Sequence, residues 1–150
     1  MGTSYAQGDR AQKTIAPIAA AYGLDDIVSE YPHRIPYFEA QKVLLDSDGI
    51  LMIGSDDPRY SASKLYPAIL AKRPILAIFP EQSLVVDILK QVKAGQVVNF
   101  APGSSPDSLE PSLSQALLWL QQNPQNPDTK LGSIFWLHRK IHDPENLQNL

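Results

Sequence analysis

Two apolar runs on either side of a short helical segment constrain the fold of this chain more than any other feature. The first run covers residues 49–54 and the second covers residues 74–79. Each run is short and almost continuously apolar, which is typical of a strand buried on both faces. The segment between them has helical character, so the pattern predicts a βαβ unit with two parallel strands.

A polar loop and a helix start lie between the two predicted strands. Ligands in βαβ units bind beyond the carboxyl ends of the strands, which here means the loop over residues 55–60 and the helix start over residues 61–65. Ser61 and Ser63 can donate hydroxyl hydrogen bonds to an anion, and Lys64 can add a positive charge. We therefore expect these two segments to line the chief polar cleft, near Ile53 and Phe79.

The same helix start also has a purely structural interpretation. Ser63 can be the N-cap and Lys64 a solvated first-turn residue, which is the commoner meaning of such a pair. Tyr66 is more often a half-buried packing residue than a ligand contact. If Ser63 is the N-cap, Pro67 lies just past the positions where a missing N–H has no cost, which predicts an irregular first turn.

The composition excludes several classes of protein. The chain has 150 residues, 43% of them apolar, which suits one domain with its own core. A net charge of −3 argues against nucleic acid as a partner. The absence of cysteine excludes disulfides, thiolate catalysis and cysteine-based metal sites. With no apolar run of about 20 residues and no signal-peptide pattern, we expect a soluble cytoplasmic protein.

Helix and strand patterns alternate along the rest of the chain. We expect helices from about residue 9 to Gly23, from Tyr37 to Ser47, around residues 85–92 with a stop at Ala94-Gly95, and over residues 109–120, together with strands over residues 27–31 and 96–100. Pro17 should kink or delay the first helix. This alternation predicts an α/β fold with a Rossmann-like, mostly parallel sheet of four strands flanked by helices.

Residues 123–150 form a linker and a C-terminal tail. The apolar residues between Leu131 and Ile141 stand beside His138, Arg139 and Lys140. Such a segment can be a short packing helix or a membrane-surface segment, and a single basic turn supports the second only weakly. The histidines do not stand at metal-ligand spacing with carboxylates, so we expect no metal site.

The central stretch resembles the donor-binding half of GT-B-type glycosyltransferases of the group 1 or family 4 kind. The likeness rests on Ser63-Lys64-Leu65, on a helix of small residues, and on the run from Ala71 to Ala77, in which a proline starts the next strand. It extends over residues 2–122, through Gly2, residues 27–36 and residues 45–51. No dinucleotide fingerprint, P-loop or serine-hydrolase elbow occurs in the sequence.

The resemblance implies the donor-binding portion of an enzyme that transfers a sugar from a nucleotide-sugar, without a metal or other cofactor. The diphosphate would lie on the start of the Ser63 helix beside Lys64, and the base near the loop His33-Arg34-Ile35. A helix start and a lysine suit the charge that develops on the leaving group. The donor-binding residues expected on this basis are Ser61, Ser63, Lys64, Leu65, Arg34, Ile35, Arg59 and Tyr66.

Two departures from the family pattern bear on activity. Pro67 and Arg59 stand where many members carry glutamates, one of which grips the donor ribose. The resemblance also implies that the family's acceptor-binding domain and the first strand-helix-strand of its donor domain would be missing ahead of Met1. We therefore expect residues 1–122 to form an incomplete domain with unpaired strand edges, and the chain alone to transfer no sugar.

Two other functional classes stay open. The first is a non-catalytic α/β domain that binds a nucleotide without turnover or binds another protein. Failure of nucleotide diphosphates to bind, or burial of residues 59–65, would favour it. The second and weaker alternative is a sugar-nucleotide epimerase-like protein.

Overall fold

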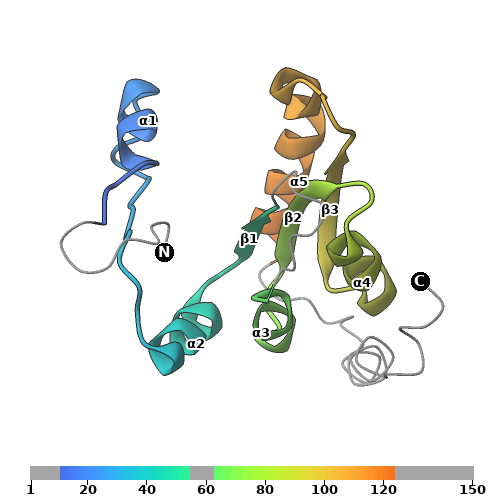
Figure 1. The fold of residues 1–150 in the computed structure, drawn as a ribbon, viewed down its shortest axis with the longest axis horizontal. Helices are drawn as coiled ribbons and strands as arrows, with labels where there is room; N and C mark the ends of the chain where they lie inside the picture. The colour runs from blue at the N-terminus through green and yellow to red at the C-terminus, as the bar shows by residue number, and fades with distance from the viewer. Residues whose placement is uncertain (1–10, 55–62, 124–150) are drawn as a thin grey trace. The chain divides into compact units, whose positions relative to one another are not determined.

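The computed structural model describes residues 11–54 and 63–123, drawn in colour in Figure 1. The chain divides into two compact units, Met1–Ala40 and Gln41–Leu150. The elements in chain order are α1 (Ala16–Ala21), α2 (Tyr37–Asp46), β1 (Ile50–Ile53), α3 (Leu65–Leu70), β2 (Ile75–Pro80), α4 (Leu84–Val92), β3 (Gly95–Phe100), the 3-10 helix η2 (Pro106–Leu109) and α5 (Glu110–Gln122).

A buried carboxylate holds the start of α1 in the first unit. Pro17 lies in the first turn, where its missing N–H has no cost, and the helix begins at Ala16 rather than near residue 9. Ile15 at the N-cap makes no side-chain capping bond. Glu30, only 8% exposed, accepts hydrogen bonds from the backbone nitrogens of Thr14, Ile15 and Ala16 at 3.0, 2.9 and 2.8 Å. The cap of α1 therefore comes from a residue distant in sequence.

The strand predicted over residues 27–31 is wrong. Ile27 and Val28 donate backbone hydrogen bonds to Leu24 in a turn, and the following residues pair with no strand in the described part of the chain. Gly23 ends α1 with a φ of +68°, as the sequence predicted. The backbone then leads to Glu30, whose side chain caps α1.

The second unit contains a three-stranded parallel sheet in the order β1-β2-β3. Ile75 of β2 lies opposite Ile50 of β1 and opposite Gly95 of β3. Helix α3 joins β1 to β2 and α4 joins β2 to β3, which confirms the predicted βαβ unit. The fold is α/β with one strand fewer among the described residues than the four predicted, because residues 27–31 form no strand.

Helices cover the sheet on both faces (Figure 1). Ile75, Ala77 and Phe79 of β2 belong to a core cluster with buried residues of α3 and α4. On the opposite face, Leu76 and Val98 pack with Ala116 of α5. Strand β2 is therefore buried on both faces, as predicted.

Strand β1 is not buried on both faces, which corrects the prediction. Ile50 is 8% exposed and Met52 packs against the α3 and α4 core. Leu51 and Ile53, on the other face, are 50% and 65% exposed. Leu51 lies beside the fully buried Leu76, but α5 packs mainly on β2 and β3 and leaves β1 uncovered.

Helix α4 has a clear cap at each end. The hydroxyl of Ser83 accepts a hydrogen bond from the backbone N–H of Val85 at 3.3 Å. At the other end Lys93 takes the left-handed conformation with a φ of +54°, so the helix stops earlier than the predicted Ala94-Gly95. Gly95 instead opens β3, where a Cβ would lie 2.0 Å from the carbonyl oxygen of Ile75. A glycine is needed at position 95 because the backbones of β2 and β3 approach closely there, and not because it ends the helix.

Candidate functional site

The helix that the sequence placed at the donor site begins at Leu65, with Lys64 as its N-cap residue. The first helical hydrogen bond runs from the N–H of Ala68 to the carbonyl of Lys64 at 3.1 Å. The side chain of this N-cap residue makes no capping bond, and Ser63 stands one position before it, so the predicted Ser63 N-cap is wrong. The later start puts Pro67 inside the first turn, where a missing N–H leaves no hydrogen bond unmade.

The side chains at this helix start divide into two exposed and two packed ones. Ser63 and Lys64 are exposed. Leu65 is 2% exposed and belongs to the core cluster, so its side chain serves packing. Tyr66 is half-buried and packs against the same cluster, which agrees with its structural interpretation. A ligand at this helix start would therefore meet the polar groups of Ser63 and Lys64.

The other predicted site residues belong to the first unit or fall outside the described residues. Arg59 and Ser61, with the rest of the loop over residues 55–62, fall outside the described residues. Arg34 and Ile35 belong to the first unit, just before α2, where Arg34 is exposed and Ile35 is half-buried. The described residues thus bring Ser63 and Lys64 together at one helix start.

Helix α3 is too short to reach the carboxyl edge of the sheet. Six helical residues extend about 9 Å, whereas the six residues of β2 extend about 20 Å. The helix leads through residues 71–74 into the first residue of β2, and Figure 1 shows it at that end of the sheet. Ser63 and Lys64 therefore lie nearer the amino half of β2 than the predicted cleft requires.

A glycine and an aromatic ring shape the carboxyl end of β1. The N–H of Gly54 donates to the carbonyl of Ile78 at 2.8 Å, which extends the β1–β2 ladder. A Cβ on Gly54 would lie 2.3 Å from Cδ1 of Phe79, and that ring is 1% exposed. The carboxyl end of β1 thus requires a residue without a side chain, since the ring fills that space.

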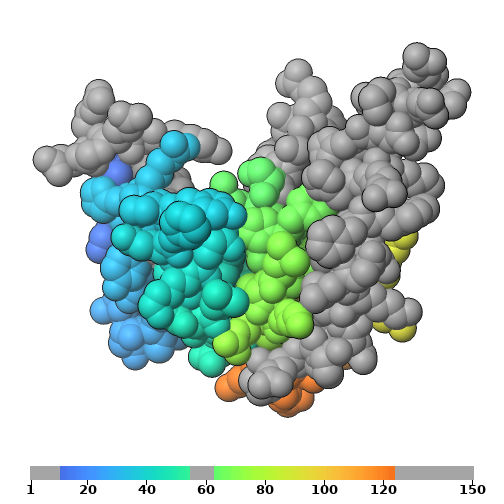
Figure 2. Space-filling model, turned by 90° about the horizontal axis from the view of Figure 1, so that it is seen from below, coloured from blue at the N-terminus to red at the C-terminus, as the bar shows by residue number. Residues whose placement is uncertain are grey.

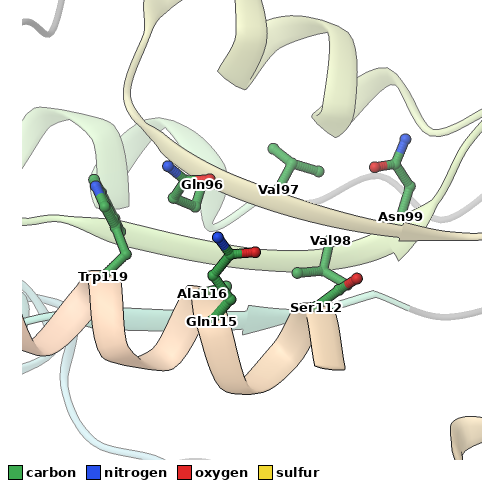
Figure 3. A pocket seen from close by; sticks show the side chains of 8 residues that line it. All are labelled: Gln96, Val97, Val98, Asn99, Ser112, Gln115, Ala116 and Trp119. Carbon is green, nitrogen blue, oxygen red and sulfur yellow. The ribbon is translucent and has the colours of Figure 1, made fainter. Parts of the chain in front are cut away.

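A groove between β3 and α5 was not predicted from the sequence (Figure 3). It has a volume of about 360 Å³ and is lined by Gln96, Val97, Val98, Asn99, Ser112, Gln115, Ala116 and Trp119. Ser112, Gln115 and Trp119 follow helical spacing, so they share one side of α5. Because none of the lining side chains is charged, the groove suits an uncharged, hydrogen-bonding ligand. The sequence carried no clear signal for this groove, because polar residues occur on more than one side of α5.

Further observations limit what the described residues can do. Over residues 11–54 and 63–123, no three His, Cys, Asp or Glu side chains are grouped so as to hold a metal ion. No helix in that part of the chain is long and apolar enough to cross a membrane. Comparisons with protein-family models, curated proteins and solved structures found no match. The functional argument therefore depends on the chain's own residues and fold.

Proposed function

We propose that this chain is the donor-binding portion of a GT-B-type glycosyltransferase and takes a nucleotide-sugar. The proposal is supported by the parallel β1–α3–β2 unit, which falls in the residues that resemble that domain. It is also supported by exposed Ser63 and Lys64 where the chain enters α3. A hydroxyl and a lysine are suitable partners for a diphosphate.

The observation that carries the proposal is the open edge of β1. Ligands of parallel α/β sheets bind at the carboxyl ends of strands where the strand order reverses. The described sheet contains no reversal, because its strand order follows the chain and α3 and α4 share one face. A further strand beside β1 would create the reversal if its own crossover helix lay on the face opposite α3 and α4, where Leu51 and Ile53 are exposed.

In this proposal the donor crevice lies beside the carboxyl end of β1, and an N-terminal half supplies the strands that complete it. Lys64 lies nearer the amino half of β2, so the diphosphate would extend from this crevice toward the start of α3 (Figure 1), where Lys64 would neutralise it as charge develops on the leaving group. The acceptor would be held by the partner domain, because transfer requires the acceptor nucleophile within near-attack distance of the donor carbon. The chain by itself is therefore expected to bind a donor weakly and to transfer no sugar.

Calorimetric titration with uridine, guanosine and adenosine diphosphates tests the site. We expect at least one to bind and Lys64→Ala to weaken it about 10-fold to 100-fold, equivalent to about 1–3 kcal/mol for a charged hydrogen bond. Lys72→Ala is the matched control, since Lys72 is an exposed lysine just past the other end of α3. Equal affinity in the Lys64→Ala variant would remove Lys64 from the site.

A second candidate function is a non-catalytic interaction domain, favoured by the uncharged groove between β3 and α5. Absence of binding by all three diphosphates would support it over the donor-binding proposal. An assay of nucleotide-sugar consumption further distinguishes the glycosyltransferase proposal from the interaction-domain alternative. Turnover by a chain extended with an N-terminal half, and none by the chain alone, is expected of a glycosyltransferase; turnover by the chain alone contradicts the need for a partner domain.

A further inference from the structure

The backbone of β1 has hydrogen-bonding groups that point away from the sheet. In a parallel ladder, alternate residues of a strand bond to the same neighbour. The N–H groups of Ile50 and Gly54 donate to Pro74 and Ile78 beside β2, at 2.9 and 2.8 Å. The alternate residues Leu51 and Ile53 therefore direct their N–H and C=O groups to the open edge, where no strand of the described residues pairs with them.

The same two residues also expose apolar side chains. Leu51 and Ile53 are the only large apolar residues of the three described strands that are exposed, at 50% and 65%. Leu117 of α5 is 50% exposed as well. It lies one turn before Leu120, whose side chain approaches Gly49 at the start of β1. Outward backbone groups and uncovered apolar side chains thus coincide at one edge.

Nothing in the sequence of β1 protects this edge from pairing. Proteins usually block a free edge with lysine, proline, an inward charge or a bulge. From Gly49 to Gly54 there is no charged residue and no proline, and the register with β2 is regular over the whole strand. The edge therefore has the properties of an interface.

We propose that β1 pairs with β1 of a second copy of this chain, antiparallel, about a two-fold axis at Met52. This pairing sets Leu51 of each copy opposite Ile53 of the other. Because both residues direct their backbone groups outward, each pair forms two hydrogen bonds, and four apolar side chains meet on one face. Met52 then lies opposite Met52 of the second copy, and these two residues form a non-hydrogen-bonded pair.

A second copy fits better than other occupants because the edge is self-complementary. A two-fold interface sets each residue against a symmetry-related patch, and charges of one sign would repel there. β1 carries none. Of the described strands, β2 has no free edge and β3 exposes no large apolar side chain, so β1 is the one that offers matching residues. The nucleotide-sugar proposal places a strand of an N-terminal half at this same edge, so that strand and the second copy exclude each other, and the pairing proposed here is that of the chain by itself.

Sedimentation equilibrium of the full chain tests the pairing. We expect a reversible dimer whose fraction rises with concentration, and roughly tenfold weaker association in Leu51→Lys, because lysine blocks strand edges. Leu70→Lys is the matched control: Leu70 at the end of α3 is 51% exposed, against 50% for Leu51. A monomer at all concentrations, or equal loss of association in both variants, would overturn the proposal.

A cross-link tests the axis independently. The chain has no cysteine, so Met52→Cys introduces a single thiol. In an antiparallel non-hydrogen-bonded pair the two Cα atoms are about 4.5 Å apart, within the roughly 4.4–6.8 Å range of disulfides. We expect a disulfide-linked dimer on mild oxidation of Met52→Cys, with circular dichroism confirming that the variant folds.

Leu70→Cys supplies the comparison for that cross-link, because it places a thiol on an exposed helix end. It should form far less linked dimer than Met52→Cys at the same concentration. Equal cross-linking in both variants would show random collision and contradict the two-fold axis. Association that survives Leu51→Lys but is lost in Val97→Pro would assign the interface to β3 instead, and would also overturn the proposal.

Discussion

The two edge strands of the sheet, β1 and β3, expose different side chains. Each pairs with β2 alone among the described residues. On β1 the residues whose backbone groups point toward the open edge are Leu51 and Ile53, and both side chains are exposed. On β3 the N–H of Glu81 donates to the carbonyl of Phe100 at 3.1 Å, so the backbone groups of Phe100 point toward β2. By alternation along the strand, the backbone groups of Val97 and Asn99 point toward the open edge. The side chains of both residues are half-buried. One edge is apolar and uncovered, whereas the other borders a groove lined by amide side chains.

The position of α5 causes this difference. Its Ala116 packs with Leu76 of β2 and Val98 of β3, so the helix covers that half of the sheet. The side of α5 nearer to β3 carries Gln115 and Trp119 of the groove. The comparison indicates that, of the two edges, only that of β1 combines outward backbone groups and uncovered apolar side chains on the same residues, as the proposed pairing requires.

Gly95→Ala is expected to have the largest effect, by separating β3 from β2. A Cβ would lie 2.0 Å from the carbonyl oxygen of Ile75, and this backbone atom cannot move without loss of the ladder. We expect a loss of about 3–4 kcal/mol in the free energy of unfolding, measured by urea denaturation. Gly103→Ala is the control, because a Cβ at Gly103 meets no atom within 4 Å, and its φ of +81° predicts a cost of about 1–2 kcal/mol.

Leu76→Ala and Leu51→Ala compare a covered and an uncovered position in the same register. Leu76 is 0% exposed and Leu51 is 50% exposed, and the two are opposite each other on neighbouring strands. We expect Leu76→Ala to cost about 3 kcal/mol of unfolding free energy and Leu51→Ala about 1 kcal/mol or less, at concentrations where the chain is monomeric. Similar losses would mean that β1 is covered in solution.

Gly54→Ala tests the carboxyl end of β1. The added Cβ would lie 2.3 Å from the ring of Phe79, which is a side chain and can shift. We expect a loss of about 1–2 kcal/mol in unfolding free energy, smaller than that of Gly95→Ala. The reverse order in the same denaturation experiment would show that the β1–β2 side of the sheet is the more tightly packed one.

Ile53→Thr should have the smallest effect on stability and a clear effect on association. Threonine keeps the β-branched shape that suits a strand, and Ile53 is 65% exposed. The unfolding free energy should change by no more than about 0.5 kcal/mol, while light scattering at high concentration should show less dimer. Unchanged association would show that the side chain of Ile53 does not contribute to the proposed dimer interface.

Local patterns predicted the elements whose structure depends on neighbours in sequence. The apolar runs at β1 and β2 and the apolar stripe of α5 form as expected. Residues 27–31 form no strand: Ile27 and Val28 bond to Leu24 in a turn, and Glu30 caps α1, a tertiary contact that local spacing does not reveal. The exposure of Leu51 and Ile53 also depends on where α5 lies, so an apolar run alone could not predict it.

The candidate site was predictable only in part for the same reason. Ser63 and Lys64 are exposed polar residues beside α3, as their sequence suggested. Leu65 belongs to the core, because the helix turns that side chain toward β2 and α4. The groove between β3 and α5 combines residues about 20 positions apart, and only the packing of α5 brings them together.

Amide hydrogen exchange, followed by NMR as a function of protein concentration, tests the central claim most directly. The N–H groups of Leu51 and Ile53 face one open edge, and those of Val97 and Asn99 face the other. We expect protection of the β1 pair to rise with concentration and fall again in Leu51→Lys, while the β3 pair exchanges at one rate throughout. Concentration-independent exchange at Leu51 and Ile53, or a rise in protection at Val97 and Asn99 instead, would contradict the account.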